Sequence, residues 1–82
     1  MLHVRAKERL QRGELPINGP SKRLTGYGSG MCALCDARIQ PSEIQYELEF
    51  VNPRLLGRTV IHFHSQCESI WNEERLRLQV PA

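Results

Sequence analysis

The clearest pattern in the chain is a strict alternation of polar and apolar residues over positions 43–50. The apolar positions are Ile44, Tyr46, Leu48 and Phe50, and the polar positions are Glu43, Gln45, Glu47 and Glu49. Successive side chains of a strand point to opposite faces, so this period of two predicts a strand with one buried face. Asn52-Pro53 interrupts the pattern, and residues 59–63 predict a second strand that pairs with the first as an antiparallel hairpin.

A helix is predicted to follow the hairpin. Ser65 and Glu68 have the S-x-x-E spacing of a capping box, which places the start of the helix at these residues. The residues expected on its inner face are Cys67, Ile70, Trp71 and Leu78. Pro81 is expected to end the helix, because proline cannot continue the backbone hydrogen bonding.

The first 29 residues have no comparable pattern. Residues 2–12 predict at most a short helix, with Gly13 just past its end, where a left-handed C-cap commonly lies. Residues 13–30 are dense in Gly, Pro and Ser, a composition typical of loops and linkers. We therefore expect a flexible arm over residues 1–29 and a folded domain over residues 30–82.

Charge separates nearly the same two regions. Residues 1–30 hold six Lys and Arg against two acidic residues, a net charge of +4, whereas residues 31–82 hold five Arg against seven acidic residues, a net charge of −2. A basic arm ahead of a mildly acidic domain is where contact with phosphates is expected. The candidate nucleic-acid-binding residues are Lys22, Arg23, Arg54 and Arg58.

The length of the chain limits its class. Eighty-two residues make one small domain, and a core of this size usually needs a disulfide, a metal or a partner chain to be stable. Three cysteines, an odd number, do not suit a disulfide framework. The charged opening residues lack the apolar core of a signal peptide, and no apolar run approaches the length of a membrane span. We therefore expect a monomer of the reducing cytoplasm without membrane contact.

All three cysteines and one histidine occur at spacings typical of metal ligands. Cys32 and Cys35 form a C-x2-C pair, and His64 and Cys67 form an H-x2-C pair at the start of the predicted helix. Three thiolates and one imidazole are the donors of a closed tetrahedral zinc site. Four protein ligands leave no position for a reactive water, so we expect one structural Zn²⁺ and no enzymatic activity.

Two alternatives at this site stay open. His62 points to the same side of an extended strand as His64, so either imidazole is placed to approach the ion. Cys67 is also compatible with a buried core thiol, in which case Cys32 and Cys35 would form a redox pair.

The segments CALCDARI and HFHSQCESIW resemble the zinc finger of poly(ADP-ribose) polymerases and some DNA ligases, a C-x2-C-x28–30-H-x2-C module. Ile39, Phe63 and Trp71 lie close to the hallmark positions of that finger, and the resemblance covers about residues 31–72. It implies a small α+β domain of the treble-clef type, with a zinc knuckle, an antiparallel hairpin or small sheet, and a C-terminal helix. It also implies recognition of DNA breaks by shape.

The whole chain is also similar to a group of small, uncharacterised bacterial zinc-binding proteins. The shared features are Leu15-Pro16, the turn over residues 26–30, Cys32 and Cys35, Tyr46-Glu47, and His64 and Cys67. This second resemblance implies no particular function.

Three functions follow from these observations. The first is binding of nucleic acid, such as DNA ends or single strands, through the finger and the basic arm. The second is an adaptor that docks a protein partner through the acidic strand and the helix. The third is a thiol-based redox or zinc sensor. A net charge of +2 decides between none of them.

Overall fold

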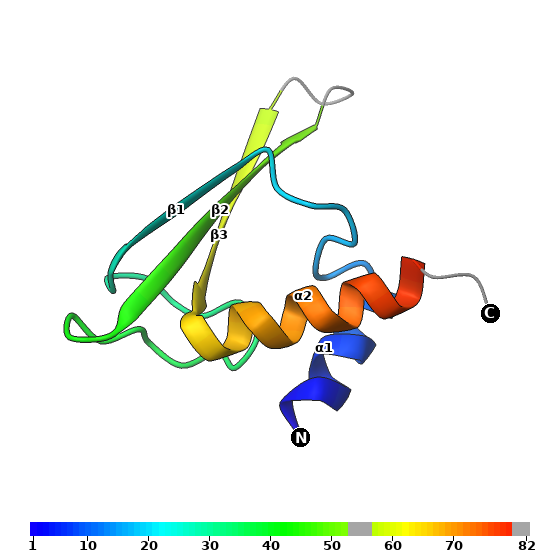
Figure 1. Cartoon of the computed structure of the whole chain (residues 1–82), viewed down its shortest axis with the longest axis horizontal. Coiled ribbons are helices and arrows are strands. Elements are labelled where there is room, and N and C mark those ends of the chain that lie inside the picture. Colours follow the sequence, from blue (N-terminus) through cyan, green and yellow to red (C-terminus); the bar gives the residue numbers. More distant parts are fainter. Residues whose placement is uncertain (53–56, 80–82) are drawn as a thin grey trace.

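The computed structural model describes residues 1–52 and 57–79. Along the chain the elements are α1 (Leu2–Gln11), β1 (Lys22–Tyr27), β2 (Ile44–Asn52), β3 (Gly57–His64) and α2 (Ser65–Gln79). The three strands form one antiparallel sheet in the order β1-β2-β3. Helix α2 packs against β2 and β3 and also against α1, as Figure 1 shows. The fold is therefore α+β, as the sequence predicted.

The hairpin of β2 and β3 confirms the prediction from the alternating pattern. Its register places Tyr46 opposite Phe63 and Leu48 opposite Ile61. Leu48 and Phe63 are fully buried, and Tyr46 and Ile61 are partly buried against the same core. The strand β3 begins two residues before the predicted start.

At the beginning of β2 the pattern of buried and exposed residues is the reverse of the predicted one. Ile44, predicted to be buried, is 53% exposed, whereas Gln45 is buried. The cause is the preceding chain, which covers the opposite face of the sheet at this end. The backbone N–H groups of Ser29 and Gly30 both donate to Oε1 of Gln45, at 3.1 and 3.0 Å. A polar side chain is thus buried with its hydrogen bonds formed, and the apolar residue beside it is left in solvent.

Strand β1 was not predicted from the sequence. Its residues, expected to form a linker, pair antiparallel with β2 from Lys22 opposite Glu49 to Tyr27 opposite Ile44. The sequence KRLTGY has no alternation of apolar and polar residues to indicate a strand, and all six residues are exposed in the structure. The edge of β2 that the hairpin leaves open supplies the hydrogen-bond partners for the β1 backbone.

The core is centred on Trp71 of α2. The ring of Phe63 stacks on it at a centroid distance of 5.4 Å, and Phe50 meets it edge-on at 6.1 Å. The indole Nε1–H donates to the carbonyl oxygen of Pro16 at 2.9 Å, which ties the segment after α1 to α2. The buried apolar residues are Ala6, Leu10, Leu15, Cys32, Leu34, Ile39, Leu48, Phe63, Cys67, Ile70 and Trp71.

The N-terminal segment corrects the predicted domain boundary. Helix α1 forms over nearly the predicted range, and Gly13 follows it with the expected positive φ of 77°. However, Ala6, Leu10 and Leu15 are buried in the same core as Trp71. The first 29 residues, with α1 packed on α2 and β1 paired in the sheet, therefore belong to the folded domain and do not form an arm ahead of it.

Helix α2 begins at Ser65, where the capping box predicts a helix start. However, Glu68 does not bind the backbone N–H of Ser65, as a capping box requires. Its carboxylate is buried and forms an ion pair with Arg23 of β1. Glu74 is also buried, because α1 covers it, and Nδ1 of His3 lies 2.8 Å from its Oε2. Two carboxylates on α2 thus connect the helix to segments far away in the sequence.

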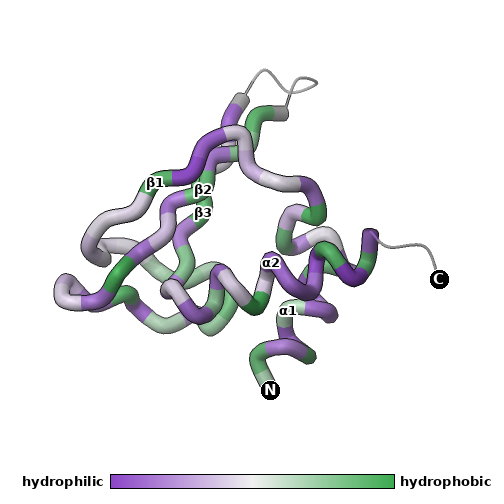
Figure 2. Tube along the Cα trace, in the orientation of Figure 1, coloured by the Kyte–Doolittle hydropathy of each residue, from purple (hydrophilic) through white to green (hydrophobic). Residues whose placement is uncertain are grey.

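The C-terminal end of α2 is less buried than its start. Leu78, predicted for the inner face, is 37% exposed, and Pro81 lies outside the described residues. Figure 2 shows hydrophilic and hydrophobic positions interspersed along both helices. Within residues 1–52 and 57–79, no helix is long and apolar enough to cross a membrane.

Candidate metal centre

The first two candidate ligands lie on a tight turn between β1 and β2. An isolated antiparallel bridge between Met31 and Arg38 closes the base of this turn. The N–H of Asp36 donates to the carbonyl oxygen of Cys32 at 3.0 Å, and Asp36 has a left-handed backbone with a φ of 65°. Asp is among the few residue types that adopt this conformation at low cost. The turn therefore brings Cys32 and Cys35 close together.

This turn, the knuckle (residues 31–38), is attached to the junction of β3 and α2. The N–H of Ala33 donates to the carbonyl oxygen of His62 at 2.8 Å, which fixes the knuckle to the end of β3. His64 is the last residue of β3, and Cys67 lies in the first turn of α2. The strand end and the helix start thus present one ligand each to the knuckle.

The four predicted ligands form one cluster. The ligand atoms of Cys32, Cys35, His64 and Cys67 all lie within 4.8 Å of one another. The Sγ of Cys35 is 3.4 Å from Nδ1 of His64. In a tetrahedral zinc site, Zn–S bonds of about 2.3 Å place two sulfurs roughly 3.8 Å apart. The cluster therefore has the size and the donor atoms to coordinate one metal ion.

The pKa values of the thiols depend on burial, on hydrogen bonds from the backbone and on repulsion between the sulfurs. Burial acts to raise the pKa of Cys32, but hydrogen bonds from the backbone at Cys35, His64 and Leu34 outweigh it and lower this pKa to about 7. Burial, with the negative charge of the neighbouring sulfurs, raises the pKa of Cys67 far above its ordinary value. A divalent cation bound by the three sulfurs would offset this repulsion and would stabilise the thiolate forms. The donor set therefore fits a metal such as zinc.

The structure distinguishes the two histidines that the sequence left open. His64 lies in the cluster, whereas Nε2 of His62 lies 3.0 Å from Oε1 of Glu47 on the neighbouring strand. The His62 ring also packs against the chain at Gly30, where an added Cβ atom would lie 3.1 Å from it. Cys67 lies with the other two cysteines, as a four-ligand site requires and an isolated core thiol does not.

Helix α1 supports the knuckle, which the sequence did not predict. Arg9 donates from Nη1 to the carbonyl oxygen of Ala33 at 2.7 Å and from Nη2 to Oδ2 of Asp36 at 2.6 Å. Arg5 donates to the carbonyl oxygen of Cys35 at 3.4 Å. The hydrogen bond from Arg9 holds the pKa of Asp36 below its ordinary range. No sequence pattern marks these contacts, since an arginine on a short helix looks the same whether it is solvated or paired.

A groove with a volume of about 520 Å³ opens beside the cluster, and Cys35, His64 and Cys67 line it. Glu43, the residue before β2, also lines the groove. Its Oε1 lies 3.5 Å from Nε2 of His64. A carboxylate therefore lies next to one candidate ligand, although none was expected beside the site from the sequence.

The acidic side chains of β2 have partners within the fold. Glu47 faces His62, and Oε1 of Glu49 lies 3.1 Å from Nη1 of Arg58. The acidic strand, expected from the sequence to be a docking surface for a protein, is thus in contact with basic groups of β3. Its negative charge is correspondingly less available to a partner.

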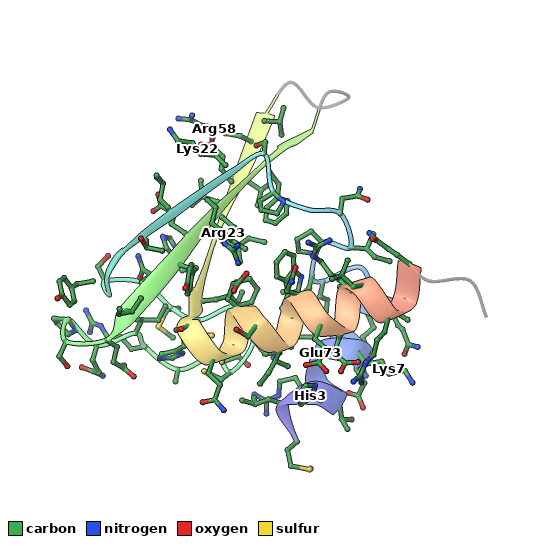
Figure 3. The ribbon with its side chains drawn as sticks, in the orientation of Figure 1. His3, Lys7, Lys22, Arg23, Arg58 and Glu73 are labelled. Atoms are coloured by element: carbon green, nitrogen blue, oxygen red, sulfur yellow. The ribbon has the colours of Figure 1, made fainter. Side chains whose placement is uncertain are left out.

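Three of the residues predicted to contact nucleic acid, Lys22, Arg23 and Arg58, lie in the described part of the chain, and they do not gather at one place. Figure 3 places Lys22 and Arg58 near the hairpin end of the sheet and Arg23 closer to α2. Arg23 is engaged by the buried carboxylate of Glu68, and Arg58 is engaged by β2. Arg54 lies outside the described residues. Contact of these residues with nucleic acid stays a prediction from the sequence.

Comparison of the chain with protein-family models, with curated proteins and with solved structures finds no match in any of the three. The resemblance to the polymerase-type finger therefore rests on the ligand spacing and the few hallmark residues quoted above. The candidate metal centre rests on its own geometry.

Proposed function

We propose that this chain is a non-catalytic zinc-binding module, in which one Zn²⁺ is held by Cys32, Cys35, His64 and Cys67. The observation that carries this proposal is the convergence of these four side chains within 4.8 Å. Three thiolates and an imidazole are donors that zinc prefers over magnesium or calcium. Four ligands from one chain complete a tetrahedron, which is the coordination of structural rather than catalytic sites.

The position of the cluster explains what a bound ion contributes. It joins the knuckle, the end of β3 and the start of α2, three segments that meet beside the core residue Cys67. Structural zinc binds to finger peptides with an apparent free energy of about 10–16 kcal/mol at neutral pH, and this free energy is coupled to folding. For a domain with so small a core, the ion supplies the cross-link that disulfides supply elsewhere.

Metal analysis and chelation test this proposal directly. We expect one zinc per chain in protein purified without added metal, and loss of the folded NMR spectrum when a strong chelator removes it. Readdition of one equivalent of Zn²⁺ is expected to restore the spectrum. A chain that keeps its dispersed spectrum after complete removal of the metal would contradict a structural role.

The partner of the module is tested separately. Titration of the zinc-loaded protein with nicked and single-stranded DNA at about 50 mM salt detects phosphate contacts, because their contribution falls steeply as salt increases. If Lys22 and Arg58 contact phosphates, a double substitution to glutamine weakens binding and reduces its salt dependence. No binding at low salt would leave a protein partner as the alternative function.

A further inference from the structure

We propose that Glu43 is a positioning residue for the metal site: its carboxylate accepts a hydrogen bond from Nε2–H of His64 and thereby directs Nδ1 toward the metal. This inference rests on the proposed zinc site. It assigns a role to a side chain that is not one of the four candidate ligands.

The geometry around the imidazole has two sides. Nδ1 of His64 faces the sulfur cluster, 3.4 Å from Sγ of Cys35. Nε2, on the other side of the ring, lies 3.5 Å from Oε1 of Glu43. The ring is therefore placed between the candidate metal position and a carboxylate.

The carboxylate is held in place by the chain around it. The backbone N–H of Gln40 donates to Oε1 of Glu43 at 2.8 Å, and the N–H of Glu43 donates to the carbonyl oxygen of Gln40 at 2.9 Å. The carbonyl oxygen of Glu43 accepts the N–H of Gly28 at 2.9 Å. The Glu43 side chain is 45% exposed, but hydrogen bonds hold both its carboxylate and its backbone in position beside His64.

The chemistry of zinc–histidine bonds explains the use of such a group. A neutral imidazole binds a metal through one nitrogen and carries its proton on the other. A carboxylate that accepts this proton fixes the tautomer and the ring orientation and makes the ligating nitrogen more basic. Removing partners of this kind typically weakens metal binding about 10- to 100-fold.

The neighbouring strand pair provides a matched control. Glu47 of β2 and His62 of β3 form another carboxylate–imidazole contact at 3.0 Å, but His62 lies outside the ligand cluster. A change at Glu47 therefore removes the same kind of contact from the same sheet without touching a ligand. A loss of zinc affinity on changing Glu43 but not Glu47 therefore indicates a role in positioning His64 and not a general role in the stability of the sheet.

The test compares E43A, E43Q and E47A by competition for Zn²⁺ with a chromophoric chelator. We expect zinc affinity to fall roughly 10- to 100-fold in E43A and less in E43Q, whose amide oxygen still accepts a hydrogen bond, with E47A close to the wild type. Long-range ¹H–¹⁵N NMR of the zinc-loaded wild type is expected to show His64 protonated on Nε2.

The outcomes separate this inference from the function on which it rests. Equal zinc affinities in E43A and E47A, or a zinc-bound His64 protonated on Nδ1, would overturn the role of Glu43 alone. A wild-type chain that binds no zinc would overturn the proposed function, and the role of Glu43 with it.

Discussion

Two regions of this domain contribute to the metal centre in different ways. Residues 31–79 carry the four ligands on a knuckle, a hairpin and a helix, and the spacing of those ligands is visible in the sequence. Residues 1–27 carry no ligand, yet α1 donates hydrogen bonds to the knuckle and β1 completes the sheet. The ligands are a local feature of the sequence, whereas their support comes from distant segments.

The comparison also changes the meaning of the charge asymmetry. Several basic residues of the N-terminal segment have partners within the fold. Arg5 and Arg9 contact the knuckle, and Arg23 pairs with Glu68 of α2. Part of the positive charge expected to serve an external partner thus compensates carboxylates and carbonyl groups of the domain itself.

Loss of a ligand from residues 31–79 is expected to have the largest effect, because the candidate metal site needs all four side chains. His64→Ala should abolish stoichiometric zinc binding and the folded spectrum at neutral pH. His62→Ala, its matched control, should retain one zinc per chain. Metal content and ¹H–¹⁵N NMR of the two variants decide the matter, and zinc retained by the His64 variant but lost from the His62 variant would reverse the ligand assignment.

The next largest effect tests whether the N-terminal segment is part of the core. Leu10→Ala should lower the free energy of unfolding by about 2–5 kcal/mol, since Leu10 is only 6% exposed against the common core. Val4→Ala on the same helix should change it little, because Val4 is 55% exposed. Urea unfolding at saturating zinc measures the free energy of unfolding of both variants. Equally small changes in the two would contradict the packing of α1 in the core.

A smaller effect is expected where the chain passes from β1 into the knuckle. A Cβ atom at Gly28 would lie 2.3 Å from Cγ2 of Ile39 and 2.5 Å from the carbonyl oxygen of Gln40. Gly28→Ala should therefore destabilise the domain by about 1–3 kcal/mol, as overpacking does. Gly26→Ala, where nothing lies within 4 Å, is the control. The Tm of Gly28→Ala should be lower than that of Gly26→Ala. Equal Tm values would contradict the close packing of Gly28 against residues 39–40.

The smallest effect concerns the contact between α1 and the knuckle. The Arg9 hydrogen bond lowers the folded-state pKa of Asp36, so its stabilisation is present above the unfolded pKa of about 3.9 and is lost as the pH falls through the lower folded value. Asp36→Asn, which tolerates the left-handed backbone, should lower Tm slightly and equally at pH 7 and pH 5.

Acid titration tests whether the contact between Asp36 and Arg9 stabilises the fold while Asp36 is ionised. The Tm difference between wild type and Asp36→Asn should narrow only below about pH 4, where protonation of the zinc ligands lowers the Tm of both chains alike. Glu14→Gln, which removes an exposed partner of Arg12 at 3.8 Å, should show a still smaller difference. A difference that widens on acidification would contradict the pairing of Asp36 with Arg9.

Prediction from sequence succeeded where the signal is short-range. Ligand spacing, the alternation from Tyr46 to Phe50 and the start of α2 at Ser65 each depend on neighbours within a few residues. The treble-clef similarity, the nucleic-acid contacts and the absence of enzymatic activity stay predictions.

Prediction failed where the cause lies far along the chain. Leu10 is buried because α1 packs on α2, about 60 positions away. The four apolar residues of α1 form no clean apolar stripe that would indicate such a partner. The strand β1 has six exposed residues, so only the open edge of β2 explains it. Gln45 is buried because the approach to the knuckle covers it, a contact that alternation alone cannot indicate.

The environment of Trp71 gives the domain an optical probe of both regions at once. It is the sole tryptophan of the chain, lies one helical turn after Cys67, and holds the carbonyl oxygen of Pro16 through its indole N–H. Its fluorescence should be blue-shifted in the zinc-loaded protein and move to the red when either the metal or the docked N-terminal segment is released. A single emission spectrum therefore follows assembly of the knuckle and docking of the first residues without any added label.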